Sequence, residues 1–137
     1  MNFGRVLLGG LLAGLVLNIG EFLLNDKVLG PQMTAFFSSH GFHDPGSNFI
    51  IIAVVMTFLL GIVTVFLYAL IRPRLGPGPK AAIVAALIMW FGIYLYSGVI
   101  NMFLFGIPMN MMIIAFVWGL VEYIIATIAG AWLYREA

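Results

Sequence analysis

Two acidic residues interrupt long apolar stretches of this sequence. Glu21 lies in the run Val6–Leu24, and Glu122 lies in the run Met109–Tyr134. A carboxylate surrounded by hydrocarbon is costly unless it is paired, protonated or hydrated, and such residues usually mark function. No Lys, Arg or His lies inside any apolar run to pair with them. Three resolutions therefore stay open, namely two protonated carboxyls, one proton shared between them, or a bound cation.

Other polar residues are expected at the same depth. A helical rise of about 1.5 Å per residue puts both carboxylates about 20–24 Å from the basic residue at the cytoplasmic end of their helices. Thr57, Tyr94 and Ser97 fall at a similar distance from the basic residues of theirs. We predict one polar layer in the outer half of the membrane, formed by these five residues and by Asn18 on the stripe of Glu21, so that its members are Asn18, Glu21, Thr57, Tyr94, Ser97 and Glu122. The layer could be a proton or cation site, or two neutral carboxylic acids could simply tie the helices together by hydrogen bonds.

The composition places these residues in a membrane protein. Of 137 residues, 64% are hydrophobic and 8% are charged, whereas soluble domains carry about 25% charged residues. The mean hydropathy is +1.15. The net charge of +1 and the lack of a long basic run argue against nucleic acid as a partner. The chain has no cysteine, so we expect no iron–sulfur cluster and no thiolate metal site.

Four apolar runs are long enough to cross a bilayer as helices. We predict an all-α fold, an integral membrane antiparallel four-helix bundle that forms a single transmembrane domain over residues 1–137. The helices are expected at about 6–24, 49–71, 81–105 and 109–134, with an external loop at 25–48 and a cytoplasmic loop at 72–80. Gly30-Pro31 is expected to open a short helix in the external loop, which ends near His40-Gly41.

The basic residues indicate the orientation. Lys and Arg are enriched on the cytoplasmic side of membrane proteins with short loops. With four crossings, Lys27 falls on the outer side, and the other basic residues all fall on the inner side. These are Arg5, Arg72, Arg74, Lys80 and Arg135. We therefore expect a multi-pass protein with both termini in the cytoplasm.

Each predicted helix carries a stripe of small and polar residues at helical spacing. Membrane helices associate through small residues and interhelical hydrogen bonds, so these stripes should face inward. Gly14 and Gly119 lie on such stripes near polar residues, and we predict that both sit at helix contacts. Gly9 lies off the stripe of the first helix, and we expect it to face lipid.

Two other groups of residues could bind ligands. Arg72 and Arg74 could hold a lipid phosphate, although anchoring the topology is the simpler role. His40, His43 and Asp44 in the external loop could form a small metal site, although such loop histidines are usually solvated. No predicted helix contains histidine, which argues against a bis-histidyl transmembrane haem and against a di-iron bundle site.

The connection between the second and third helices reads Tyr68-Ala69-Leu70-Ile71-Arg72-Pro73-Arg74-Leu75-Gly76-Pro77-Gly78-Pro79-Lys80. Together with the C-terminal run from Gly130 to Glu136, it resembles a family of small bacterial four-helix membrane proteins of no established activity. The resemblance extends over the whole chain and implies a bacterial inner membrane. It carries over no catalytic residues.

The chain lacks a Gly-rich phosphate loop, a Ser/His/Asp set and a catalytic Cys, so we expect no enzyme activity. The first expectation is a small accessory or scaffold subunit that packs through its helix surfaces. It would act among membrane lipids as a homo-oligomer or in a larger membrane complex. The alternative is a minimal conduit for a proton, a cation or a small solute that uses Glu21 and Glu122.

Overall fold

The computed structural model describes residues 1–42 and 46–134, and this part of the chain contains helices and no strand. In chain order the elements are α1 (Phe3–Phe22), the π-helix η1 (Leu23–Val28), α2 (Gly30–Ser39), α3 (Gly46–Leu75), α4 (Pro79–Trp90), the π-helix η2 (Phe91–Tyr96), α5 (Ser97–Phe105) and α6 (Met109–Leu133). Because η1 continues α1 and η2 joins α4 to α5, four helices in the described ranges are long and apolar enough to cross a membrane. The four predicted helices are therefore present.

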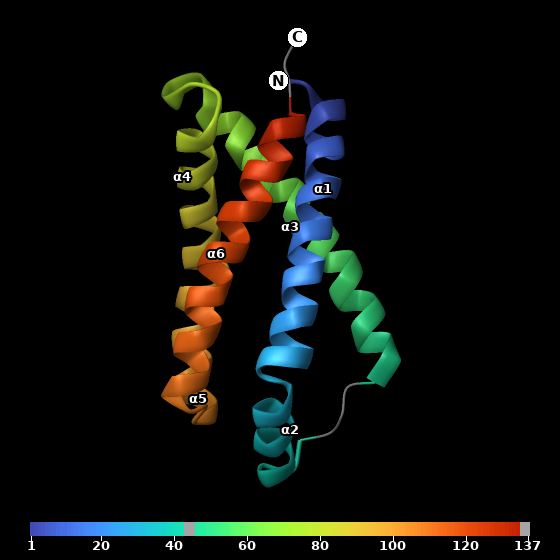
Figure 1. The fold of residues 1–137 in the computed structure, drawn as a ribbon, viewed down its shortest axis with the longest axis vertical. Helices are drawn as coiled ribbons and strands as arrows, with labels where there is room; N and C mark the ends of the chain where they lie inside the picture. Colours follow the sequence, from blue (N-terminus) through green and yellow to red (C-terminus); the bar gives the residue numbers. More distant parts are fainter. Residues whose placement is uncertain (43–45, 135–137) are drawn as a thin grey trace.

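The start of α1 and the end of α6 lie at one end of the molecule together with the turn between α3 and α4, and we call this the termini end (Figure 1). The helix α2 and the turn between α5 and α6 lie at the opposite end, the α2 end. The helix α1 packs against α3 and α6, and α4 packs against α6 and α3. The packing is tightest toward the termini end, where α3 buries residues from Gly61 to Ala69. Toward the α2 end α3 diverges from the other helices (Figure 1).

Glycines allow α1 to approach two neighbours at backbone distance. A Cβ atom added to Gly61 of α3 would collide with the backbone nitrogen of Gly14, so α1 and α3 touch there without intervening side chains. A Cβ atom on Gly9 would lie 2.5 Å from the carbonyl oxygen of Gly130 in α6. Gly14 thus sits at a helix contact as predicted. The expectation that Gly9 faces lipid is wrong, because Gly9 is buried in the seam between α1 and α6.

The buried core fills the half of the bundle nearer the termini. It consists of Val6, Ala13, Leu17, Val65, Tyr68, Ala69, Ala81, Ala82, Ala85, Ala86, Tyr123, Ala126 and Tyr134. The alanines of α4 form two adjacent pairs, Ala81-Ala82 and Ala85-Ala86, one helical turn apart, and each is fully buried. Small side chains at this spacing give α4 a flat face on which α6 packs closely.

Two helices extend beyond the predicted boundaries. The helix α3 includes Pro73 and ends at Leu75. A proline near the end of a helix removes only one backbone hydrogen-bond donor, so the helix can continue past it. Gly76 then donates its N–H to the carbonyl of Arg72 at 2.8 Å and ends the helix in the left-handed conformation, with φ +82. The first helix continues through η1 into residues that were expected to be loop. The short helix predicted between the first two spans begins at Gly30 and ends at Ser39.

Candidate functional site

Glu21, Tyr94 and Glu122 meet between three helical segments. Glu21 lies in the last turn of α1, Tyr94 lies in η2, and Glu122 lies in the middle of α6. The Tyr94 hydroxyl is within hydrogen-bonding distance of Glu21 Oε1 and 3.3 Å from Glu122 Oε2. The structure therefore brings together three of the six residues of the predicted polar layer. We call these three residues the carboxyl–tyrosine cluster.

The number of protons in this cluster is limited. A phenolic hydroxyl carries one proton, so Tyr94 can donate to only one of the two carboxyl groups at a time. Its contact with the other carboxyl is a hydrogen bond only when that carboxyl carries a proton and donates it to the phenolic oxygen. The complete bridge is thus compatible with at most one negative charge shared by Glu21 and Glu122.

Two glycines make room for the cluster. A Cβ atom on Gly119 would lie 2.6 Å from the ring of Tyr94, which packs flat against the backbone of α6 at this point. A Cβ atom on Gly20 would lie 2.8 Å from the carboxyl carbon of Glu122. Gly119 sits at a helix contact as predicted, and the role of Gly20 was not expected. Both positions explain how bulky polar side chains fit between closely packed helices.

Further contacts hold the three segments in place. The indole N–H of Trp118 donates to the carbonyl oxygen of Gly20 at 3.0 Å, which ties α6 to α1 one turn from Glu122. The ring of Tyr123 meets that of Tyr94 edge to face, with centroids 5.9 Å apart and an interplanar angle of 80°. The cluster is therefore fixed by neighbours on each side.

The cluster can be reached from the α2 end. Asn25 is exposed, and its side-chain amide donates to the backbone oxygen of Glu21 at 2.9 Å and to Glu21 Oε2 at 3.0 Å. Glu21 is partly exposed, whereas Glu122 is only 6% exposed. Hydrogen bonds therefore connect an exposed amide to a buried carboxyl through Glu21 and Tyr94.

The chain of hydrogen bonds that begins at Asn25 ends at Glu122. Its Oε1 atom is buried and has no hydrogen-bond partner among the residues that the structure describes. Toward the termini end, the hydroxyls of the buried Thr64 and Thr127 donate to Leu60 and Tyr123 carbonyls of their own helices, at 2.7 and 2.6 Å. The alanine-rich core fills this half of the bundle. The cluster is thus open toward one end of the molecule and closed toward the other.

Both π-helices border the cluster. Glu21 lies just before η1, and Tyr94 lies within η2. A π-helical turn inserts an extra residue into a helix and often occurs at functional sites. Here η2 changes the direction in which the side chains of the third span point, and Tyr94 faces α6 and α1 as a result.

The other residues of the predicted layer do not join the cluster. Asn18 donates to Gly14 O at 2.9 Å and to Val54 O at 3.4 Å, so it supports the contact between α1 and α3. Thr57 donates to Ala53 O at 2.6 Å, and Ser97 donates to Ile93 O. Both hydroxyls thus satisfy backbone groups of their own helices.

Of the three residues predicted as a possible metal site, only His40 is among the described residues. His40 Nδ1 lies 2.9 Å from the carbonyl oxygen of Phe36, at the end of α2. His43 and Asp44 lie outside the described residues. No group of three or more His, Cys, Asp or Glu residues that could hold a metal occurs among the residues that are described.

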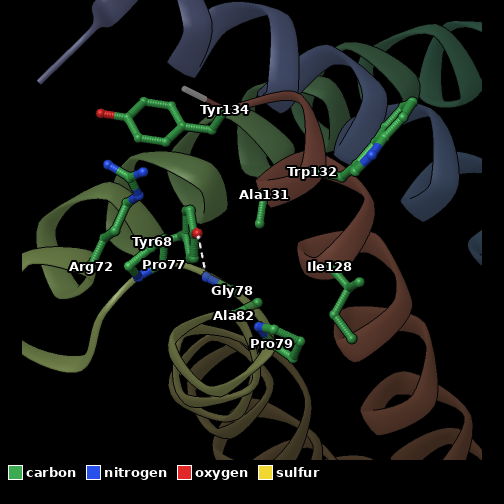
Figure 2. Close-up of a pocket in the computed structure, with 10 residues that line it drawn as sticks. All are labelled: Tyr68, Arg72, Pro77, Gly78, Pro79, Ala82, Ile128, Ala131, Trp132 and Tyr134. Atoms are coloured by element: carbon green, nitrogen blue, oxygen red, sulfur yellow. Dashed lines mark hydrogen bonds between the residues drawn. The ribbon is translucent and has the colours of Figure 1, made fainter. Parts of the chain in front are cut away.

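A second polar site lies at the termini end, where a cavity of about 260 Å³ separates α3, α4 and α6 (Figure 2). Arg72 and Tyr68 line it from α3, and Tyr134 lines it just after α6. The Tyr68 hydroxyl accepts a hydrogen bond from the N–H of Gly78 at 3.1 Å. The Arg72 guanidinium lies 5.5 Å from the centre of the Tyr134 ring. Arg74 is exposed and does not line the cavity.

No family model matches the chain, and no curated protein or solved structure matches it. The resemblance drawn from the loop and the C-terminal run therefore stays a prediction. The function must be argued from the geometry of the two sites.

Proposed function

We propose that this chain is a multi-pass protein of a bacterial inner membrane that binds a proton reversibly at the carboxyl–tyrosine cluster. Four apolar helices support the membrane location. Among the described residues, the basic side chains at the termini end are Arg5, Arg72, Arg74 and Lys80, whereas Lys27 lies at the α2 end. This distribution favours cytoplasmic termini. The cluster then faces the outer side.

The observation that carries the proposal is the single phenolic hydroxyl between two carboxyl groups. With both carboxyls ionised, the Tyr94 hydroxyl could donate to only one of them. The other carboxylate would lack this hydrogen bond and would lie close to a second negative charge. Glu122 Oε1 would then be a buried charged atom without a partner in the described structure. A proton on one carboxyl removes this charge and completes the bridge.

The bridge also provides a transfer step. A proton that arrives on Glu21 from the outer side can pass to the Tyr94 oxygen while the proton of Tyr94 passes to Glu122. One O–H bond breaks and one forms at each transfer, and the tyrosine ends neutral. Because the core beyond Glu122 is packed with apolar side chains, the described state takes up and holds a proton but does not conduct it across the membrane.

The test is infrared difference spectroscopy on the purified protein across a pH titration. A protonated-carboxyl band should be present in the parent and should be lost or shifted in Glu21→Gln, Glu122→Gln and Tyr94→Phe. Ser97→Ala is the matched control, because Ser97 belongs to the predicted layer but not to the cluster, and it should keep the band. A band unchanged in both Gln variants would contradict the proposal. A band that disappears on addition of Na⁺ or K⁺ at constant pH would assign the site to a monovalent cation instead.

A second candidate function is an accessory or scaffold subunit, and it has its own observation. In the outer half of α3, the side chains from Phe49 to Ile52 are 55–62% exposed, and they point to all sides of the helix. A partner helix, from a second copy or from a larger complex, could pack there. Cross-linking in native membranes from a cysteine at Ile51 tests this role, and recovery of the monomer alone would argue against it.

A further inference from the structure

We propose that the cavity between α3, α4 and α6 at the termini end binds the phosphate group of an anionic membrane lipid. The proposal rests on the membrane orientation given above, but it does not depend on the proton site. No step of the carboxyl–tyrosine cluster involves these residues, which lie at the opposite end of the spans (Figure 1).

The cavity offers a buried donor. Tyr68 is 2% exposed and lines the cavity, and its oxygen accepts from Gly78. No described residue accepts the proton that Tyr68 itself can donate. A buried hydroxyl whose proton has no acceptor favours a ligand that supplies an oxygen atom. Figure 2 shows this hydroxyl beside the backbone of Gly78, on the wall formed by α3 and the start of α4.

The start of α4 forms part of the cavity wall. The helix begins at Pro79 without a side-chain cap, and Gly78, Pro79 and Ala82 line the cavity. The start of a helix carries a partial positive charge and favours phosphate oxygens. Gly78, with φ +115, turns the chain into α4 in a conformation that L side chains rarely adopt. The turn therefore presents the helix start and the Gly78 backbone to the same cavity.

Arg72 supplies a full positive charge. Its guanidinium reaches from α3 toward the Tyr134 ring at the cavity wall (Figure 2). Arginine donates several N–H groups in a planar arrangement that matches phosphate oxygens. A cavity of about 260 Å³ is large enough for a phosphate group but too small for a whole lipid, so the acyl chains would lie outside it.

The position of the cavity selects a lipid over a soluble anion. Trp132 lines the cavity and is 70% exposed, and exposed tryptophans of membrane proteins concentrate at headgroup level. Exposed Lys80 follows Pro79 of the cavity wall on the chain. In the proposed orientation this end faces the cytoplasmic leaflet, where anionic lipids concentrate and attract basic residues. A phosphodiester between headgroup and glycerol would lie at this depth.

The test measures lipid binding to the full chain in neutral detergent by native mass spectrometry, with phosphatidylglycerol as the probe. Arg72→Gln and Tyr68→Phe should each weaken binding by about tenfold or more, because each removes a donor to a charged group. Arg74→Gln is the matched control, since it removes the same charge two residues away outside the cavity, and it should bind like the parent. Arg72→Lys should bind less tightly than the parent, because it keeps the charge but loses the planar donors.

Three outcomes would overturn the proposal. Equal losses in Arg72→Gln and Arg74→Gln would show general attraction to a basic surface. Full competition by millimolar inorganic phosphate would assign the cavity to a soluble anion. Unchanged lipid binding in both Arg72→Gln and Tyr68→Phe would exclude the cavity. The thermal stability of each variant without lipid, measured in parallel, separates loss of binding from loss of folding. Because the readout is lipid binding, none of these outcomes bears on the infrared test of the proton site.

Discussion

The substitution Gly119→Ala should break the carboxyl–tyrosine cluster by displacing one ring. The new Cβ atom would lie 2.6 Å from Tyr94 Cγ, whereas ordinary contact begins near 3.4 Å, so the ring must move by about 0.8 Å. Cγ is the ring atom nearest the backbone, and the side chain cannot avoid the clash by bending at its tip. The ring has to move away from α6, and therefore away from Glu122 on the same helix.

The expected cost follows from three contributions. Overpacking a tight contact costs about 1–3 kcal/mol. The Tyr94–Glu122 separation of 3.3 Å is already long, so the shift removes a hydrogen bond worth about 1 kcal/mol. Alanine gains about 1 kcal/mol over glycine in a helix interior. The net destabilisation of Gly119→Ala should therefore be about 1–3 kcal/mol.

The assay is reversible unfolding in mixed detergent micelles, followed by circular dichroism, and Gly92→Ala is the control. Gly92 lies in η2 near Tyr94, and a Cβ atom there meets nothing within 4 Å. Its replacement should leave stability unchanged or raise it by up to about 1 kcal/mol. The infrared carboxyl band should shift in Gly119→Ala and stay in place in Gly92→Ala. Equal stability of the two variants, with the same band, would refute the account of the cluster.

Three further predictions use other parts of the molecule. Glu21→Gln and Glu122→Gln should show coupled effects on the unfolding free energy in a double-mutant cycle, and strictly additive effects would mean that the two groups do not interact. Gly9→Leu should lower the melting temperature strongly, because the seam with α6 has no room for a side chain; a melting temperature close to that of the parent would place this seam elsewhere. In intact cells, an impermeant thiol reagent should label Ser39→Cys and not Gly76→Cys, and the reverse pattern would invert the proposed orientation.

The sequence was sufficient to predict the four helices and most of their inward faces. Apolar length fixes where helices can span, and small residues at helical spacing mark contacts, as Gly14 and Gly119 show. The meeting of Glu21 with Glu122 and Tyr94 followed from depth along the helices. Depth alone could not separate these three residues from the rest of the layer. That separation depends on how each helix is rotated.

Rotation is also what made Gly9 unpredictable. A helix with neighbours on two sides needs two contact faces, and α1 packs against α3 through Gly10 and Gly14 and against α6 through Gly9. A single stripe of small residues describes only one of these faces. The π-helical segments raised the same difficulty, because η2 shifts the helical phase before Ser97 and no residue type marks such a shift. The role of Gly20 depends on where Glu122 of another helix lies, which no local pattern records.

The apolar packing between the cluster and the termini end argues against a continuous conduit in this arrangement of the helices. A conduit needs polar groups or water on both sides of its central site, and here the hydrogen-bonded path joins Glu122 to the α2 end alone. The other half is held by glycine contacts in which backbones touch, such as Gly9 with Gly130, and these leave no room for water without separating the helices. At the α2 end the helices diverge, and the cluster with the Trp118–Gly20 bond joins α1 to α6 there. A change of charge at the proposed proton site would therefore affect the half of the bundle that is less tightly packed. In the proposed orientation, release of a proton to the cytoplasm would require a second arrangement of α1 against α6, whereas uptake and release on the outer side would require none.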